Sequence, residues 1–197
     1  MEQDALEADP YLKKRISFTH GDHTLQFDVA NTLFSSFEVD QGTALLLRAM
    51  EIEPPRRVLD LGCGYGVLGI TLASLYPEAE VVMADSDLLA VRYAKHNCTL
   101  NGVSNVCVVG SIGLERVPPG AFDLIVSNIP AKIGDAAIEQ EFILALLERL
   151  APGGAYWFVV VSGLNRLIPK LGTRHDLRLK QVRKRSGHAV YRLYRRE

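Results

Sequence analysis

Between residues 57 and 161, short apolar runs alternate with longer helix-like stretches. The runs are rich in Val, Ile and Leu and are too short to be helices, which is typical of buried strands. Alternation of strands and helices requires a parallel sheet whose two faces are covered by helices. We therefore expect an α/β, Rossmann-like fold. The expected strands are 58–61, 81–84, 106–109, 122–126 and 155–161, and the expected helices are one ending at Leu75 and two over 87–100 and 135–150.

The chain ends with a different pattern. Residues 177–185 and 188–195 both have the composition of strands, and only Ser186 and Gly187 separate them. A link of two residues is too short for a parallel crossover, so these strands must be antiparallel. The sequence thus predicts a mostly parallel sheet of seven strands with an antiparallel C-terminal hairpin.

A second, shorter hairpin is expected near the N-terminus. Apolar residues alternate with mostly polar ones on either side of His20-Gly21-Asp22, which has the composition of a turn. Asp40 then precedes a helix-like run over 41–50, in the position of an N-cap. We expect residues 1–50 to form a hairpin and helix extension, packed on a domain that spans residues 51–197.

Composition excludes several classes of protein. No apolar run reaches the length of a membrane span, and the acidic start of the chain lacks the apolar stretch of a signal peptide. The three cysteines form no Cys-x-x-Cys pair, so no disulfide framework is predicted. His20 and His23 bracket a turn without a third ligand nearby, so no metal site is predicted. We expect a cytoplasmic, water-soluble protein.

Charge is distributed unevenly, although the net charge is only −1. Residues 1–165 hold 11 Lys and Arg against 21 Asp and Glu, a balance of −10. Residues 166–197 hold 11 against two, a balance of +9. A basic end on an acidic body suggests a polyanionic partner such as RNA. The alternative is a solvated sheet edge, on which Lys and Arg discourage aggregation.

The side of the hairpin that would face such a partner follows from strand geometry. Alternate residues of a regular strand share a face, so Lys180 and Lys184 are expected to project together, with Arg178. Arg183 and Arg185 are then expected to point the other way.

The strongest local signal is DLGCGYGVLG at residues 60–69, which follows an expected strand and opens a helix. Glycines let backbone approach a ligand closely, and a helix N-terminus offers free N–H groups. Gly64-x-Gly66-x-x-Gly69 fits a dinucleotide fingerprint, in which Asp85 after the next strand would hold a ribose hydroxyl. Asp60-x-Gly62-x-Gly64-x-Gly66 also fits the acidic, triple-glycine loop of S-adenosylmethionine enzymes. The loop alone favours an adenosine cofactor of either kind.

A second motif, SNIPAKIG at residues 127–134, begins where the fourth expected strand ends, and ligands of open α/β sheets bind at such ends. With it, the chain resembles the methyltransferase small domain family of class I methyltransferases, which includes ribosomal RNA guanine-N2 methyltransferases. The matching pieces keep the family's order and spacing from Phe34 to Arg195. They are Phe34-Ser35 with residues 39–43, residues 58–69, Asp85, Asn97 with Asn101, residues 109–111 and residues 122–128.

The resemblance implies that the cofactor is S-adenosylmethionine and that a methyl group is transferred to an exocyclic amino nitrogen of RNA. In the family, Asp or Asn is frequent where this chain has Ile112, so backbone contact and apolar packing would replace a side-chain hydrogen bond there. The implied cofactor-binding residues are Asp60, Gly62, Gly64 and Gly66 around the methionine part, Asp85 with Ser86 at the ribose, Ser111 and Ile112 against adenine, and Phe34, Gly42 and Thr43 at the methyl-donor end.

The catalytic turn departs from the family pattern of Asn-Pro-Pro followed by an aromatic or apolar residue. The resemblance implies that the side-chain oxygen of Asn128 and the carbonyl of Ile129, followed by Pro130, hold the N–H groups of the target amine. Ile129 lacks the fixed φ of proline, so we expect a less preorganised turn. Ala131 cannot stack on a base, and Lys132 is a candidate for a substrate phosphate.

Three other functions compete with RNA methylation. A methyltransferase acting on a protein or small molecule fits Ala131 but leaves the basic hairpin unexplained. A cofactor-binding domain that has lost catalysis and binds RNA fits Ile129 and Ala131, but not the intact Asp60 loop. A nicotinamide dehydrogenase has no use for the turn at Asn128.

Overall fold

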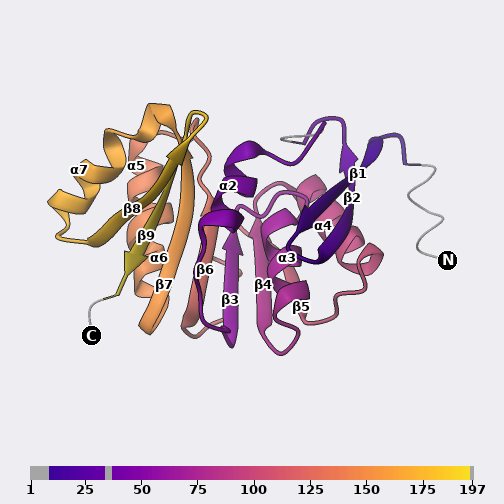
Figure 1. Ribbon diagram of the computed structural model, residues 1–197, viewed down its shortest axis with the longest axis horizontal. Helices are drawn as coiled ribbons and strands as arrows, with labels where there is room; N and C mark the ends of the chain where they lie inside the picture. Colours follow the sequence, from indigo (N-terminus) through magenta and orange to yellow (C-terminus); the bar gives the residue numbers. More distant parts are fainter. Residues whose placement is uncertain (1–8, 34–36, 196–197) are drawn as a thin grey trace.

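The computed structural model describes residues 9–33 and 37–195. Its main sheet has seven strands in the order β5-β4-β3-β6-β7-β9-β8, so β6 lies at its centre with β3 beside it (Figure 1). Strands β3 to β7 run parallel, whereas β9 is antiparallel to both of its neighbours. The predicted fold class is confirmed. The strands are β3 (Arg57–Leu61), β4 (Glu80–Asp85), β5 (Val106–Gly110), β6 (Phe122–Asn128), β7 (Leu150–Val161), β8 (Arg178–Arg185) and β9 (His188–Tyr194).

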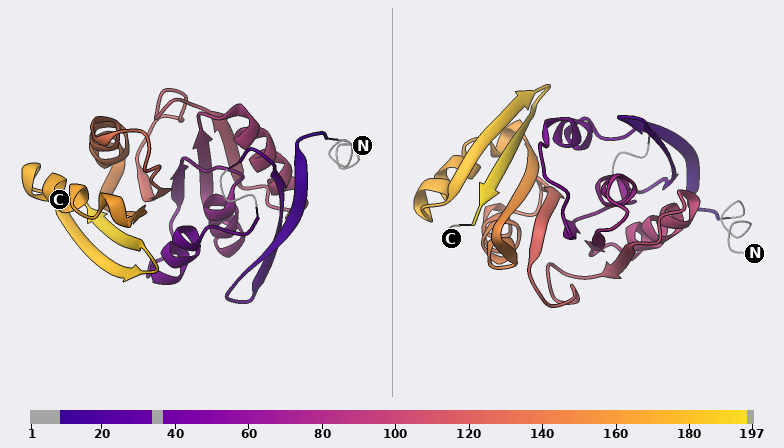
Figure 2. Two further views of the ribbon diagram at one scale, coloured as in Figure 1. Left: turned by 90° about the horizontal axis from the view of Figure 1, so that it is seen from above. Right: turned by 60° about the horizontal axis from the view of Figure 1, so that its bottom comes forward.

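Helices cover both faces of this sheet (Figure 2). Strand β7 shows why, because its successive side chains enter different cores. Trp157 and Val159 join the cluster under the first group of helices, and Tyr156 and Phe158 join the cluster under the second. The first group is α2 (Gln41–Ala49), α3 (Val67–Leu75) and α4 (Leu88–Leu100); the second is α5 (Asp135–Ala137), η1 (Ile138–Leu144), α6 (Ala145–Glu148) and α7 (Leu167–Arg174), which follows a short 3₁₀ turn, η2 (Ser162–Leu164).

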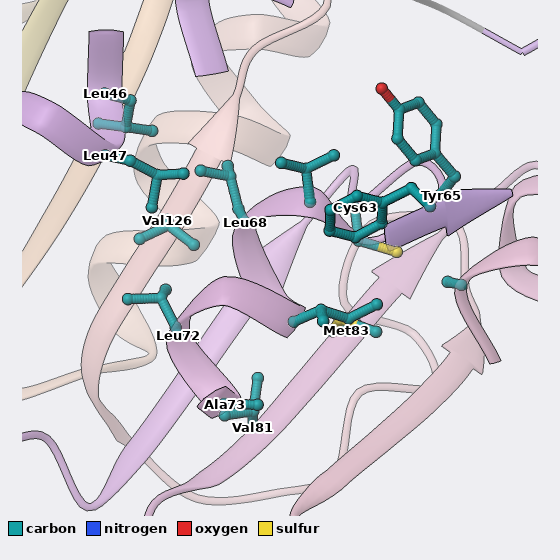
Figure 3. Packing of buried hydrophobic residues seen from close by; sticks show 14 of the residues in the cluster. Leu46, Leu47, Cys63, Tyr65, Leu68, Leu72, Ala73, Val81, Met83 and Val126 are labelled. Atoms are coloured by element: carbon teal, nitrogen blue, oxygen red, sulfur yellow. The ribbon is translucent and has the colours of Figure 1, made fainter. Parts of the chain in front are cut away.

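Figure 3 shows the first core from close by, where Leu68 and Leu72 of α3 pack beside Val126 of β6, and Met83 of β4 belongs to the same cluster. Burying a side chain of this size stabilises the fold by roughly 1.5–3 kcal/mol. The glycine loop begins next to this core, so it is supported by closely packed side chains. Within the two described ranges, no helix combines the length and apolar character that a bilayer crossing requires.

Three segments differ from the sequence-based expectation. The helix expected over 135–150 is present but irregular, because its middle part, η1, has π-helical hydrogen bonding. Strand β7 begins at Leu150, ahead of the expected start at residue 155. Helix α7 was not expected at all, since it is only eight residues long and contains Pro169 and Gly172.

The N-terminal hairpin forms a separate two-stranded sheet of β1 (Leu12–His20) and β2 (His23–Ala30), as expected. It lies against α4 (Figure 1), and the side chains of α4 bond to its backbone. Fully buried Asn97 accepts from the N–H of Asp28 at 2.8 Å and donates to the carbonyl oxygens of Asp28 and Tyr65. Asn101, the C-cap of α4, bonds in the same way to Gln26. Asn97 thus connects the hairpin to the glycine loop.

Replacing Asn97 with Ala is expected to destabilise the protein by about 2–4 kcal/mol, because three buried backbone groups lose their partner at once. Denaturant unfolding measures the loss. Gln26→Ala, which removes only an exposed side-chain bond to Ser17, is the control and should change stability by about 0.5 kcal/mol or less. Equal effects of the two changes would contradict this role of Asn97.

Candidate active site

A pocket of about 990 Å³ opens where β3, β4 and β6 end at the same edge of the sheet. Asp60 and Gly66 lie behind its wall, with Asp60 fully buried. Phe34, expected at the methyl-donor end, lies outside the described residues. The expected residues that the structure brings together on the pocket wall are Thr43, Gly62, Gly64, Asp85, Ser86, Ser111, Ile112, Asn128, Ile129, Pro130 and Lys132.

The glycine loop is held against β4 by backbone hydrogen bonds. The N–H groups of Gly62 and Cys63 both donate to the carbonyl oxygen of Ala84, at 2.8 and 3.1 Å. Gly62, Gly64 and Gly66 have φ of 74°, 56° and 102°, a region that strains any residue with a side chain. These glycines are therefore required by the backbone conformation, and the loop presents bare backbone to the pocket.

Cys63 contributes packing to the loop. Burial raises the pKa of its thiol well above the ordinary value, which leaves it protonated and a poor nucleophile. The interpretation of Cys63 as a packing residue fits this environment.

Asp60 supports the loop from beneath. Its Oδ2 accepts the N–H of Gly69 at 2.8 Å, which holds the first turn of α3 close to β3. Its Oδ1 is buried and has no hydrogen-bond partner within the described part of the chain. Burial raises the pKa of Asp60 to about 7, with a further rise from the charge of Asp85 and an opposing effect from the Gly69 N–H. Positive charge in the pocket would therefore favour the ionised form of Asp60.

Asp85 stands at the end of β4, on the pocket wall. Its two oxygens accept the N–H groups of Gly64 and Asp87, at 2.8 and 2.9 Å. An ionised carboxylate has about four lone-pair sites, so it can accept further bonds from a ligand.

The segment expected against adenine has one polar and one apolar part. The hydroxyl of Ser111 is used within its own turn, since it donates to the carbonyl oxygen of Gly113 and accepts the N–H of Arg116. Ile112 is 65% exposed and lies on the pocket wall. Apolar packing by Ile112 is the contact that this segment offers to a flat ring.

The turn after β6 is better anchored than the sequence led us to expect. Ile129 is only 2% exposed and belongs to the second core, and its N–H donates to the carbonyl oxygen of Val159 at 3.0 Å. Proline lacks an N–H and could not make this bond. Burial and this hydrogen bond hold Ile129 in place, although it lacks the fixed φ of proline. Ala131 and Lys132 are exposed on the rim.

Sequence reasoning missed a contact between Asn128 and the start of α2. Asp40 is the N-cap, as expected, and its Oδ2 accepts the N–H of Thr43 at 2.9 Å. The same Oδ2 accepts the Asn128 Nδ2 at 2.8 Å, and the Thr43 hydroxyl oxygen accepts Nδ2 at 3.0 Å. No signal in the sequence connects residues 88 positions apart.

The predicted faces of the basic hairpin are wrong, because β8 contains a bulge. The register between β8 and β9 shifts between Gln181 and Arg183, so Val182 has no opposite partner and the alternation reverses. Directly opposite residues share a face of an antiparallel pair, which puts Lys184 on the face of Ala189 and Lys180 on the face of Arg192. Lys180 and Lys184 therefore point to opposite sides. The residues that share the Lys180 face are Arg178, Arg183 and Arg185, opposite Tyr194, Val190 and His188.

The turn of this hairpin reaches the pocket. His188 lines the pocket wall, and its ring lies so close to α2 that a Cβ on Gly42 would be 2.8 Å from the ring. The four basic side chains of the Lys180 face are exposed, and the row ends at Arg185, opposite His188. One face of the hairpin thus carries positive charge to the edge of the pocket.

Comparison with known proteins matches residues 24–192 to the methyltransferase small domain. The chain belongs to the methyltransferase small domain family. The family resemblance seen in the sequence is thereby confirmed. Ribosomal RNA small subunit methyltransferase C of Hahella chejuensis is 38% identical over 149 residues, which cover 74% of this chain and 42% of that protein. The protein of the same name from Pseudomonas aeruginosa (strain LESB58) is 32% identical over 195 residues, covering 97% and 58%.

Solved structures are similar as well. The T. thermophilus 16S rRNA N2 G1207 methyltransferase (RsmC), in complex with AdoMet and guanosine, has a TM-score of 0.80 and 26% identity, and the match covers 95% of this chain and 52% of that one. A ribosomal protein L11 methylase from Lactobacillus delbrueckii subsp. bulgaricus has a TM-score of 0.68 at 21% identity and shows the shared fold. This methyltransferase small domain spans about half the length of the curated relatives it matches.

The raised pKa of Asp60 predicts how stability depends on pH. Between its ordinary value of 3.8 and about 7, the folded protein binds a proton that the unfolded chain releases. The stability contributed by this proton is full below the ordinary pKa and is lost as pH rises through the folded value, at up to about 1.4 kcal/mol per pH unit. Between about pH 5 and about pH 8, urea unfolding should show a larger loss for the wild type than for Asp60→Asn. Equal losses would remove Asp60 as the titrating group.

Proposed function

We propose that this chain transfers a methyl group from S-adenosylmethionine to an exocyclic amino nitrogen of ribosomal RNA, of the guanine-N2 type. The observation that carries the proposal is the joint placement of the Asn128 turn and the glycine loop on one pocket. The identity to two rRNA small subunit methyltransferases C and the likeness to an N2-guanine methyltransferase that holds AdoMet support it.

The pocket residues fit this cofactor. A Cβ built on Gly64 would meet nothing within 4 Å, so open space faces the backbone of the loop. The unpartnered Oδ1 of buried Asp60 lies behind that loop and favours a ligand that carries positive charge. When bound, S-adenosylmethionine supplies an electrophilic methyl group on a positively charged sulfur. The residues proposed to hold it are Asp60, Gly62, Gly64 and Gly66 at the methionine part, Asp85 and Ser86 at the ribose, Ser111 and Ile112 at the adenine, and Thr43, with Phe34, at the methyl-donor end.

In this proposal the protein's chemical contribution is to hold and orient the amine. Asn128 Oδ1 and the carbonyl oxygen of Ile129 accept the two N–H groups of the target, with Pro130 following in the turn. These acceptors favour the positive charge that develops on nitrogen as it reacts, and they are fixed before the substrate arrives. Ala131 offers no ring for stacking, so an amine on a protein or small molecule is the second candidate acceptor.

The cofactor assignment is tested by calorimetry with S-adenosylhomocysteine and NAD in parallel. S-adenosylhomocysteine should bind, and Asp85→Ala should weaken it by about 1–3 kcal/mol, because hydrogen bonds to a charged acceptor are lost. Asp123→Ala, a change at the opposite edge of the sheet, where Asp123 accepts the N–H groups of Arg56 and Arg57, is the control. Tight NAD binding without S-adenosylhomocysteine binding would contradict the proposal.

We further propose that the Lys180 face of the hairpin binds the RNA backbone, with Lys132 at the pocket rim. Arg178, Lys180, Arg183 and Arg185 are exposed, and none of the ion pairs in the described part of the chain involves them. Arg192, on the same face, lies over the rings of Trp157 and Tyr194, at 5.1 and 4.1 Å from their centroids. Arg192 is therefore occupied by these aromatic rings and adds positive charge beneath the exposed side chains of this face.

The bulge supplies a matched pair of variants for this proposal. Three or four neutralised phosphates predict a log–log salt slope of about −2 to −3 for single-stranded RNA. Lys180→Glu should lower the magnitude of that slope by about 0.7, the share of one phosphate, whereas Lys184→Glu on the other face should leave it nearly unchanged. S-adenosylhomocysteine affinity should not change in either variant. A slope that responds equally to both changes would contradict the assignment of RNA binding to the Lys180 face. RNA binding that ignores salt would favour a protein or small-molecule acceptor.

A further inference from the structure

The side-chain amide of Asn128 has only one orientation that fits its surroundings. One side of the amide meets the Asp40 carboxylate at 2.8 Å and the Thr43 hydroxyl at 3.0 Å. An ionised carboxylate only accepts hydrogen bonds, so the atom that faces it must be the NH₂ group. Both hydrogens of that group are then used, and Oδ1 must point away from Asp40.

The two acceptors are themselves held firmly. Asp40 caps α2 through the Thr43 N–H, and Leu45 and Leu46 of α2 are buried in the first core. Gly42 allows the close approach, because a Cβ there would lie 2.8 Å from Asp40 Oδ2 and equally near the ring of His188. The cap, the buried leucines and the close approach at Gly42 thus hold the start of α2 against the end of β6.

We propose that Asp40, assisted by Thr43, is a positioning residue that fixes the Asn128 amide with Oδ1 turned toward the substrate. A flipped amide would place its oxygen against the carboxylate and would offer N–H groups to the substrate. The fixed orientation therefore selects a nitrogen that carries hydrogens, an exocyclic amine, over a ring nitrogen that only accepts. This inference rests on the proposed function for its consequence in catalysis, but the fixed orientation itself is independent of any substrate.

The orientation is tested by NMR hydrogen exchange on the purified chain. The side-chain amide signal of Asn128 is assigned by its absence in Asn128→Asp. Its exchange should be at least about tenfold faster in Asp40→Ala, where a charge-assisted bond is lost, and clearly faster in Thr43→Val, which keeps the α2 cap. Asp123→Ala should leave it unchanged. Unaltered exchange in both Asp40→Ala and Thr43→Val would overturn the proposal, whatever the activity of the protein.

The catalytic consequence is tested by exchanging the two groups. Asn128→Asp places two carboxylates in contact and should lower kcat about 100-fold or more, a loss typical of a disrupted preorganised site. Adding Asp40→Asn restores a donor facing an acceptor, so the double variant should recover at least about tenfold of that loss. The affinity for S-adenosylhomocysteine should stay within about threefold of wild type in the double variant, which separates orientation from cofactor binding.

The outcomes separate the two proposals. If losses in the single variants simply multiply in the double variant, Asp40 acts only as a helix cap, and the positioning role is wrong. If the wild type transfers no methyl group to RNA while the Asn128 amide is protected by Asp40, the proposed function fails and the fixed orientation stands.

Discussion

The hydrogen bond from the Gly69 N–H to buried Asp60 is the contact on which the site depends. It draws α3 so closely against the sheet that a Cβ on Gly69 would lie 3.1 Å from Asp60 Oδ2 of β3 and 2.2 Å from the sulfur of Met83 of β4. This close approach sets where α3 begins, and the glycine loop must then turn sharply between the strand and the helix. The loop's left-handed glycines and its two bonds to Ala84 follow from that constraint. The arrangement buries the carboxyl group of Asp60 beneath the pocket, and this burial raises its pKa because the ionised form is less stable there.

Around this centre, elements distant in sequence complete the pocket. Helix α2 brings Asp40 and Thr43 to the end of β6, and the turn of the C-terminal hairpin brings His188 to the same place. The N-terminal hairpin is tied to the glycine loop through Asn97. The pocket is therefore a joint product of both ends of the chain, which fits a family match that extends from residue 24 to residue 192.

What the sequence could reveal was mostly local. Strand runs, the glycine loop, the two hairpins and the Asp40 cap depend on patterns within a few residues, and all of them are present in the structure. The bond between Asp40 and Asn128 joins residues that only the folded sheet brings together. The bulge at Val182 shifts the strand register, and no glycine or proline at this position indicates it in the sequence. The rule of alternating faces therefore failed there. Helix α7 has only eight residues and contains Pro169 and Gly172, which are unfavourable inside a helix, so the sequence did not predict it.

The same reasoning changes the interpretation of the turn after β6, which is proposed to hold the amine. Where the family pattern has a proline, whose ring fixes φ, this chain has Ile129. Its position is held instead by burial and by a hydrogen bond to Val159. The departure from the family pattern thus removes no acceptor from the pocket. Its remaining consequence is at Ala131, which offers no ring for stacking, so under the proposed function the basic hairpin would supply more of the affinity for RNA.

The most direct test of this account is methyl transfer from labelled S-adenosylmethionine to deproteinised ribosomal RNA, followed by nucleoside analysis. The account predicts label on N2-methylguanosine, with a rate that falls about 10²–10³-fold in Asn128→Ala, where the acceptor for the amine is lost. Label on a ring nitrogen or a ribose, or an unchanged rate in Asn128→Ala, would contradict it.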